Sequence, residues 1–201
     1  MPKRRKKKKK SIKRKAVLCI MSALLLLLLC IAAYFVNNYI ERTSYRMPYK
    51  AEILEFSKKY ELEPALVAAV MHCESGNQSD SVSIKGAIGL MQIMPETGEW
   101  IAHKLNIEEY SAEMLYDPRV NVEMGCWYLN FLKQRFNNNF TNFIAAYNAG
   151  HGKVEEWLEN SEYALDGQLV DIPYKETREY VKRVKSAMEK YEELYEQALY
   201  E

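Results

Sequence analysis

The residue best placed to do acid–base chemistry is Glu74, which ends an apolar helix predicted over residues 64–74. In that helix Leu66, Val70 and Cys73 recur at i, i+4 and i+7, which predicts one buried face. Glu74 follows Val70 by four residues, so its carboxyl group leaves the same side of the helix. Partial removal from water and the negative end of the helix dipole both favour the neutral carboxyl and raise its pKa. A carboxylic acid that stays protonated near neutral pH can protonate the leaving oxygen of a glycosidic bond.

On this placement alone, an acid at a helix end is more often an ordinary solvated terminus, so the neighbouring residues decide its interpretation. Residues 75–89 are rich in Gly, Ser, Asn and Asp, which predicts an ordered loop directly after the acid. Hydroxyl and amide groups can hydrogen-bond sugar hydroxyls and N-acetyl groups, and Gly86 and Gly89 let the backbone approach a ligand closely. The composition of the loop therefore favours a carbohydrate substrate.

Five short blocks of residues, in a fixed order along the chain, carry a resemblance to a known family. They are Glu74-Ser75-Gly76; Val82-Ser83 with Gly86 to Thr97 (GAIGLMQIMPET); Asp117-Pro118, Asn121, Gly125 and Tyr128-Leu129; Ala145 to Gly150 (AAYNAG); and Glu176 to Val181 (ETREYV). Together they resemble the soluble lytic transglycosylase (SLT) family of lysozyme-like enzymes, over about residues 62–184. The departures are few: Asn77 and Ser79 stand where an aromatic residue and Pro are usual, and His151 stands where Pro is common.

The resemblance implies a lysozyme-like fold of the goose-type lysozyme and SLT kind, and peptidoglycan cleavage with Glu74 as the catalytic acid. The reaction that the resemblance implies needs no cofactor. The residues that it implies around the bound sugar come from the loop, from the AAYNAG block and from the last helix. They are Ser83, Met91, Gln92, Tyr147, Asn148, Glu176 and Tyr180. On spacing alone, Met91 and Tyr147 are equally compatible with plain core positions.

The number of carboxylates separates two reactions. Most glycosidases use two carboxylates that flank the bond, whereas the only acid between Glu74 and Glu96 is Asp80. A single acid suits the reaction that the resemblance implies, in which the C6 hydroxyl of the muramyl sugar closes on C1 and leaves a 1,6-anhydromuramyl end. If Asp80 acted as a second carboxylate, the enzyme would instead be a muramidase. We expect Asp80 to be a solvated loop acid.

Charge is segregated along the chain. Of the 28 Lys and Arg residues, 11 lie between Lys3 and Lys15, and the first acidic residue is Glu41. Between them, Ala16 to Val36 is a run of 21 residues without a charge. At about 1.5 Å per residue, a helix of this length crosses the roughly 30 Å hydrocarbon core of a membrane. The run is longer than a cleaved secretory segment and lacks a convincing cleavage site, so it predicts a retained signal anchor.

The same charges predict an orientation. By the positive-inside rule, residues 1–15 form a cytoplasmic tail, 16–36 the single membrane span, 37–50 a polar stalk and 51–201 an extracytoplasmic domain facing the cell wall. A basic run beside a span is explained by topology and anionic lipids, so we expect no nucleic-acid partner. The acidic outer part does not suit polyanion binding either. We expect peptidoglycan strands and the membrane as partners, and the sequence identifies no protein partner.

The outer part reads as helices separated by turns, so the predicted fold class is all-α. The expected helices are 51–60, 64–74, 95–105, 120–135, 141–147, 154–159 and 174–200. The loop before the last helix contains Asp166-Gly167. No alternating run long enough to indicate a strand is present.

The remaining candidates for chemistry are cysteines and histidines. Cys73 and Cys126 follow the predicted span, in an oxidising compartment, and each interrupts a motif in the middle of a helix. They could form a disulfide, or both could be buried thiols that act as small apolar groups. The three histidines show no ligand spacing, so no metal site is expected. A catalytically idle domain that binds glycan strands and scaffolds an envelope assembly is the competing function, and the presence of Glu74 argues against it.

Overall fold

The structure is a computed structural model that describes the backbone of residues 2–200. Side chains are described for residues 17–196 and for Leu199, so the side chains of the predicted basic tail at 1–15 lie outside the described residues. The chain divides into two compact units, with the boundary between Arg46 and Met47. Each unit is described by itself.

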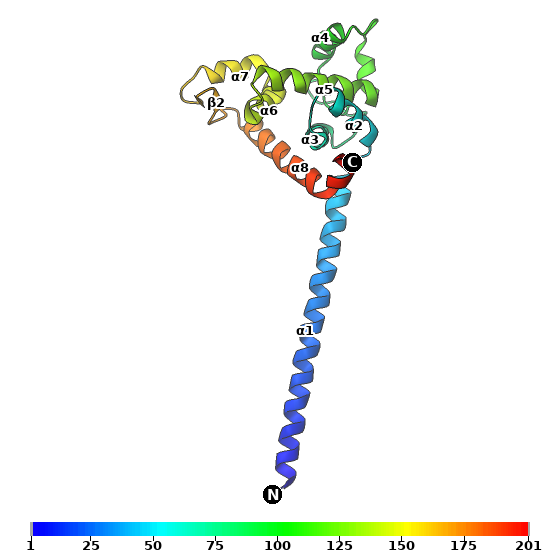
Figure 1. The fold of residues 1–201 in the computed structure, drawn as a ribbon, viewed down its shortest axis with the longest axis vertical. Coiled ribbons are helices and arrows are strands. Elements are labelled where there is room, and N and C mark those ends of the chain that lie inside the picture. The colour runs from blue at the N-terminus through cyan, green and yellow to red at the C-terminus, as the bar shows by residue number, and fades with distance from the viewer. Residues whose placement is uncertain (1, 201) are drawn as a thin grey trace. The chain divides into compact units, whose positions relative to one another are not determined.

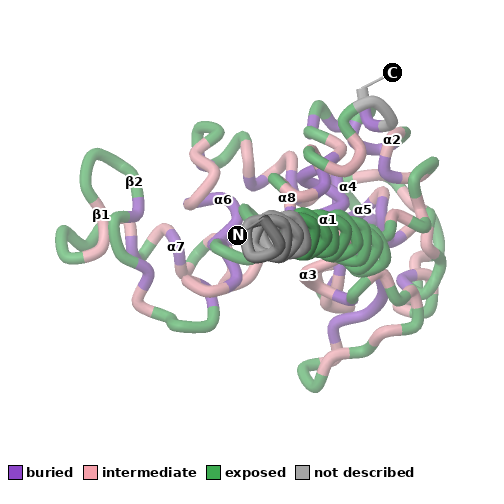
Figure 2. Tube along the Cα trace, turned by 90° about the horizontal axis from the view of Figure 1, so that it is seen from below, coloured by how far each residue is buried: buried purple, intermediate pink, exposed green. Residues whose placement is uncertain are grey.

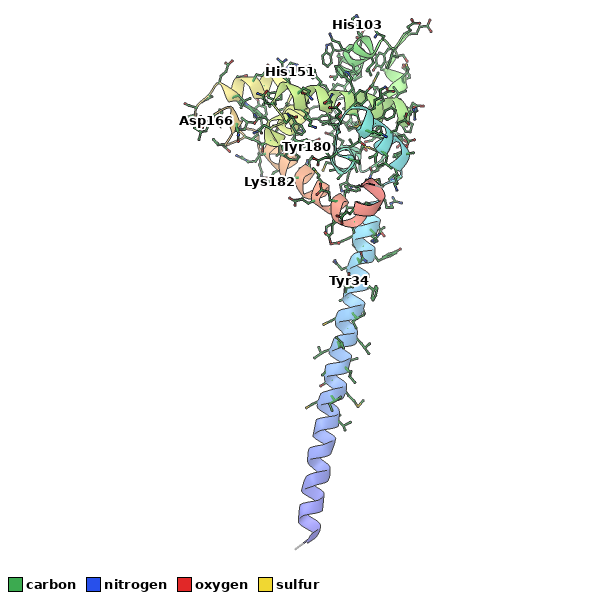
Figure 3. All side chains as sticks on the ribbon, in the orientation of Figure 1. Tyr34, His103, His151, Asp166, Tyr180 and Lys182 are labelled. Carbon is green, nitrogen blue, oxygen red and sulfur yellow. The ribbon has the colours of Figure 1, made fainter. Side chains whose placement is uncertain are left out.

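The first unit is a single helix, α1 (Pro2–Ser44). Its segment Val17–Ser44 is the one described helix that is long and apolar enough to cross a membrane, judged by length and composition. Apolar side chains from Val17 to Ile40 are exposed, Tyr34 among them (Figure 3). The predicted span at 16–36 lies inside this helix, and the helix continues through most of the segment predicted as a stalk.

The second unit is built from helices, with one small hairpin (Figure 1). In chain order the elements are α2 (Lys50–Lys59), α3 (Pro64–Ser75), α4 (Pro95–Leu105), the 3₁₀ helix η1 (Ala112–Tyr116), α5 (Pro118–Arg135), α6 (Phe140–Ala149), α7 (His151–Leu158), β1 (Ala164–Leu165), β2 (Gln168–Leu169) and α8 (Lys175–Tyr200).

Helix α3 lies in the core of this unit. Every residue from Ala65 to Met71 is at most 4 % exposed, because α8 and α2 pack against it. In Figure 1, α8 (orange to red) runs beside α3 (teal). Helix α5 packs on α2 and α6, and α6 packs on α7 and α8. Figure 2 shows the buried residues concentrated where these helices meet.

Local chemistry sets where the helices begin and end. Proline occupies the first turn of α3, α4 and α5, where its missing N–H costs nothing. The Asp117 side chain accepts hydrogen bonds from the N–H groups of Arg119 and Val120 and caps α5. Gly76, at φ +62°, ends α3 in the left-handed conformation. This stop places Glu74 in the last turn of α3, at the edge of the core.

The predicted helices are confirmed to within three residues at each end. Two elements were not predicted. The 3₁₀ helix η1 is too short to show a periodic pattern. The β1–β2 hairpin pairs two residues with two across Asp166 and Gly167, both with positive φ. Such a turn favours antiparallel pairing, so the segment expected to be a loop contains this short strand pair.

Candidate active site

Glu74 lies at the end of α3, where α8 passes over it. The hydroxyl of Tyr180 on α8 donates a 2.6 Å hydrogen bond to Oε1 of Glu74. Tyr180 is 1 % exposed and points into the compact unit (Figure 3). Burial raises the pKa of Glu74 to about 7, because the charged form loses solvation. The carboxyl group can therefore both give and take a proton near neutral pH.

Three groups on α8 act on this carboxyl with opposite signs. The hydrogen bond from Tyr180 and the positive charge of Arg183 lower the pKa of Glu74, while the negative charge of Glu176 raises it. Arg183 also lies over the Tyr180 ring, with its guanidinium carbon 5.8 Å from the ring centroid. Burial outweighs the two groups that favour the carboxylate, so the net effect is a weaker acid.

Tyr147 on α6 forms a second part of the site. Its hydroxyl donates a 2.8 Å hydrogen bond to the backbone oxygen of Met91. Burial raises the pKa of Tyr147 well above its usual value, and the nearby charge of Glu74 acts in the same direction. Tyr147 is therefore neutral, and its hydroxyl proton is used in the hydrogen bond to the loop that carries Met91.

That loop, residues 81–93, is held by short backbone bridges. Val82 pairs with Ile88, and Ile88 pairs with Ile93. The Ser83 hydroxyl accepts a hydrogen bond from the N–H of Ala87. Gln92 has a φ of +48°, and its side-chain nitrogen donates to the backbone oxygens of Ser81 and Gly89. In this structure Ser83 and Gln92 thus shape the loop, in addition to the cleft role that the resemblance implied.

Asn121, on α5, holds this loop against the helix through hydrogen bonds. It is fully buried, accepts a hydrogen bond from the N–H of Met91, and donates to the backbone oxygens of Ile88 and Leu115. The Met91 side chain is also fully buried, in contact distance of Gly125 on the same helix. A β-carbon on Gly125 would lie 2.2 Å from the Met91 sulfur, so this position needs glycine.

Two further contacts join the site together. The Thr177 hydroxyl on α8 donates a 2.8 Å hydrogen bond to the side-chain oxygen of Asn148 on α6. The Ser75 hydroxyl lies 2.8 Å from the backbone oxygen of Leu90, which ties the end of α3 to the loop. The predicted Asn148 is thus used to hold α8, and Thr177 is the partner that sequence reasoning did not single out.

The structure brings most of the expected residues together. Tyr180 acts on Glu74 through a hydrogen bond and Glu176 acts on it through charge. The charge of Glu74 in turn acts on Tyr147, which holds the Met91 backbone. Arg183, Ser75 and Asn121 complete this arrangement without having been assigned a role in the site. Asn121 and Ser75 stand inside the matched blocks, which was the only signal available for them. Arg183 carried no such signal.

Asp80 occupies the outside of the loop. Its side chain is exposed, and among the described residues neither a hydrogen bond nor an ion pair connects it to the Glu74 carboxyl. No group of three or more metal-binding side chains is found in the described part of the chain.

The sequence allowed a disulfide between Cys73 and Cys126. In the structure both are free thiols. Helix α3, with Cys73, packs on α8 and α2, whereas α5, with Cys126, packs mainly on α6 and α2. Burial raises the pKa of the Cys73 thiol to about 11 and raises that of Cys126 further. Both are therefore uncharged groups that fill space beside the site.

Comparison with known proteins gives a consistent result. Residues 52–169 match the family described as the transglycosylase SLT domain. The soluble lytic murein transglycosylase of Escherichia coli (strain K12) is 40 % identical over 127 residues, which cover 62 % of this chain and 20 % of that protein. The membrane-bound lytic murein transglycosylase C of Actinobacillus pleuropneumoniae (serotype 5b, strain L20) is 29 % identical over 161 residues, which cover 69 % of this chain and 44 % of that protein.

Solved structures agree. The 70 kDa soluble lytic transglycosylase of Escherichia coli superposes with a TM-score of 0.69 at 33 % identity, covering 76 % of this chain and 25 % of that one. An inactive mutant of the lytic transglycosylase Slt from Pseudomonas aeruginosa superposes with a TM-score of 0.68 at 35 % identity, covering 74 % and 24 %. This chain thus spans about a fifth to a quarter of those soluble relatives. The predicted lysozyme-like, SLT-type fold is confirmed.

Proposed function

The chain belongs to the transglycosylase SLT family, and on this premise we propose that it is a peptidoglycan lytic transglycosylase with Glu74 as its catalytic acid and base. The observation that carries the proposal is the partly buried Glu74 carboxyl, with a pKa raised to about 7 and a 2.6 Å hydrogen bond from Tyr180. A group with this pKa is half protonated at neutral pH, so it can perform both proton transfers.

In the first step, the Glu74 carboxyl protonates the oxygen of the β-1,4 bond between N-acetylmuramic acid and N-acetylglucosamine. The bond from that oxygen to C1 of the muramyl sugar breaks, and neighbouring groups of the sugar capture the cationic C1. In the second step, the Glu74 carboxylate takes the proton of the C6 hydroxyl as its oxygen bonds to C1. The products are a 1,6-anhydromuramyl end and a free 4-hydroxyl, and no water is consumed.

The surroundings of Glu74 favour this single-acid course. The hydrogen bond from Tyr180 and the charge of Arg183 stabilise the carboxylate that exists between the two steps. Between Glu74 and Glu96 the only other acid is Asp80, and its side chain is exposed. The remaining proposed substrate contacts are those of the loop and of α6 and α8. They are Ser83, Met91, Gln92, Tyr147, Asn148, Glu176 and Tyr180.

We also propose that α1 anchors the protein in the bacterial cell membrane as a single span. Its segment Val17–Ser44 has the necessary length and composition, and one of the relatives is named a membrane-bound transglycosylase. The basic residues Lys3–Lys15 place the N-terminus in the cytoplasm and the catalytic unit on the side of the cell wall. The domain division at 1–15, 16–36, 37–50 and 51–201 is part of this proposal.

The test uses the full chain in detergent and purified peptidoglycan. Wild type, Glu74→Gln, Asp80→Asn and Glu179→Gln are compared, and released muropeptides are identified by mass spectrometry. We expect anhydromuramyl ends from wild type and from both control variants, and none from Glu74→Gln. Reducing ends that disappear in Asp80→Asn would establish a muramidase instead. A folded wild-type protein that binds peptidoglycan without releasing muropeptides would establish the glycan-binding scaffold.

A further inference from the structure

A cavity lies between α4, α5 and α7. Its volume is about 300 Å³, and it is lined by Glu96, Thr97, Trp100, Tyr128 and His151. None of these residues is used in the mechanism above. Two of them, Trp100 and Glu96, are exposed, so the cavity is open to solvent.

Aromatic rings form the wall of this cavity. The Trp100 ring centroid lies 6.2 Å from that of Tyr128 and 5.1 Å from that of Phe131. Phe131 in turn lies 6.1 Å from the His151 ring. Trp127 stacks on Phe131 with an interplanar angle of 5° and meets Trp100 edge-on. Because each ring contacts others, the rings form one continuous aromatic surface beside the cavity.

The charge of the lining is negative. Glu96 contributes one carboxylate, Thr97 contributes a hydroxyl, and no Lys or Arg lines the cavity. Within the described part of the chain, no ion pair neutralises Glu96. A carboxylate beside aromatic rings is the environment that attracts an organic cation, since the ring faces and the carboxylate act in the same direction.

The cavity is connected to the catalytic site through one ring pair. Tyr128 lines the cavity, and its ring centroid lies 5.6 Å from that of Tyr147. Tyr147 is the residue whose hydroxyl holds the Met91 backbone beside Glu74. The cavity therefore lies one ring pair away from the residues around Glu74.

We propose that this cavity binds the primary ammonium group on the diamino acid side chain of the peptidoglycan stem. The proposal deepens the proposed function and rests on it. The sugars of the strand are neutral, and the lactyl carboxyl group of muramic acid is joined to the stem, so the stem amine is the cationic group that the substrate offers. Glu96 would form an ion pair with the ammonium group, and the Trp100 and Tyr128 rings would contact that group. The Thr97 hydroxyl oxygen would accept a hydrogen bond from one of its N–H groups.

The test compares cleavage of two un-crosslinked peptidoglycan strands by the full chain in detergent. One carries free stem amines, and the other has those amines acetylated with acetic anhydride. We expect wild type to prefer the free-amine strand by about fivefold or more in kcat/KM. Glu96→Gln and Trp100→Ala should bring this ratio close to one. Glu99→Gln, which removes a neighbouring exposed carboxylate on the same helix, should keep the wild-type ratio.

Equal cleavage of both strands by wild type, or an unchanged ratio in Glu96→Gln, would overturn the proposal. So would a Trp100→Ala variant that loses both strands equally, because that result would assign the cavity to a sugar ring. If wild type cleaves neither strand, the proposed function fails, and a separate measurement then decides the cavity. Isothermal titration of the full chain with the tripeptide L-Ala-γ-D-Glu-L-Lys and with its Nε-acetyl form should show binding of the first alone.

Discussion

The hydroxyl of Tyr180 lies 2.6 Å from Oε1 of Glu74, although 106 residues separate the two in sequence. This hydrogen bond stabilises the carboxylate form, so it opposes the effect of burial on the pKa of Glu74. The position of α8 against α3 therefore sets both the geometry and the proton affinity of the proposed catalytic acid.

Replacing Tyr180 with Phe removes that hydrogen bond and leaves the ring. The pKa of Glu74 should rise above its present value of about 7, and the pH optimum of kcat/KM should move to higher pH. Activity at pH 7 should fall roughly tenfold, as expected for a lost hydrogen bond to a charged group. The measurement is a pH–rate profile of muropeptide release. An unchanged profile with reduced activity would mean that Tyr180 acts on the substrate and not on Glu74.

Arg183 and Glu176 should shift the same pKa in opposite directions. Arg183→Gln removes a positive charge and should raise the pKa of Glu74, whereas Glu176→Gln removes a negative charge and should lower it. Both residues are exposed, so salt should weaken the two shifts. The pH profiles of the two variants at low and high ionic strength check this. Shifts of the same sign in both variants would contradict the arrangement described here.

Glu74 should also limit stability at alkaline pH. Its folded pKa of about 7 exceeds the model-compound value of 4.5, so the folded state binds the proton more tightly than the unfolded state. The stabilising contribution is complete below about pH 4.5 and is lost as pH rises through about 7. Glu74→Gln, which stays neutral, should therefore be more stable than wild type at pH 8, by up to about 3 kcal/mol.

Urea unfolding of both proteins at pH 5 and pH 8, followed by near-UV circular dichroism, measures this difference. The advantage of Glu74→Gln should be small at pH 5 and clear at pH 8. An advantage of equal size at both pH values would show that the carboxyl does not titrate in this range.

Asn121→Ala should destabilise the catalytic unit strongly. The change leaves the Met91 N–H and the backbone oxygens of Ile88 and Leu115 without their partner in a buried place. We expect a loss of about 3–5 kcal/mol. Asn130→Ala on the same helix is the matched control, because its side chain makes only a 3.5 Å contact with Gln134 at the surface. Equal Tm values for the two variants would refute the role of Asn121.

Gly89→Ala tests the approach of the loop to α5. A β-carbon at this position would lie 2.2 Å from the Asn121 side-chain nitrogen and 2.4 Å from the Leu115 oxygen, and the φ of Gly89 is +80°. Both effects predict a loss of at least about 2 kcal/mol and a large loss of activity. Gly152→Ala, in α7, meets no atom within 4 Å and has no positive φ, so it should be neutral or slightly stabilising. Thermal unfolding of both variants measures these changes in stability.

The sequence predicted those features that depend on local periodicity. The apolar stripe ending at Glu74 predicted both a helix and a raised pKa, and the structure agrees with each. The composition of residues 75–89 predicted a loop directly after Glu74, and α3 does end there, because the backbone preference of Gly76 is local.

Features that depend on packing between distant segments could not be predicted from the sequence. Tyr180 came only from the family resemblance, because nothing in α8 itself indicates which of its tyrosines meets Glu74. The three hydrogen bonds of Asn121 exist because the loop folds onto α5. A single Asn in a helical pattern does not predict them. Arg183 stands among other charged residues of α8, and only the orientation of that helix brings its charge to Glu74.

The contact between α3 and α8 has a consequence for the order of biosynthesis. Glu74 is translated about a hundred residues before Tyr180 and belongs to a helix whose buried face remains uncovered until α8 arrives. A nascent or C-terminally truncated chain therefore holds the acid without the hydroxyl, charges and covering helix that tune it. The proposed catalytic acid therefore reaches its tuned state only once α8 has been synthesised and has packed on α3.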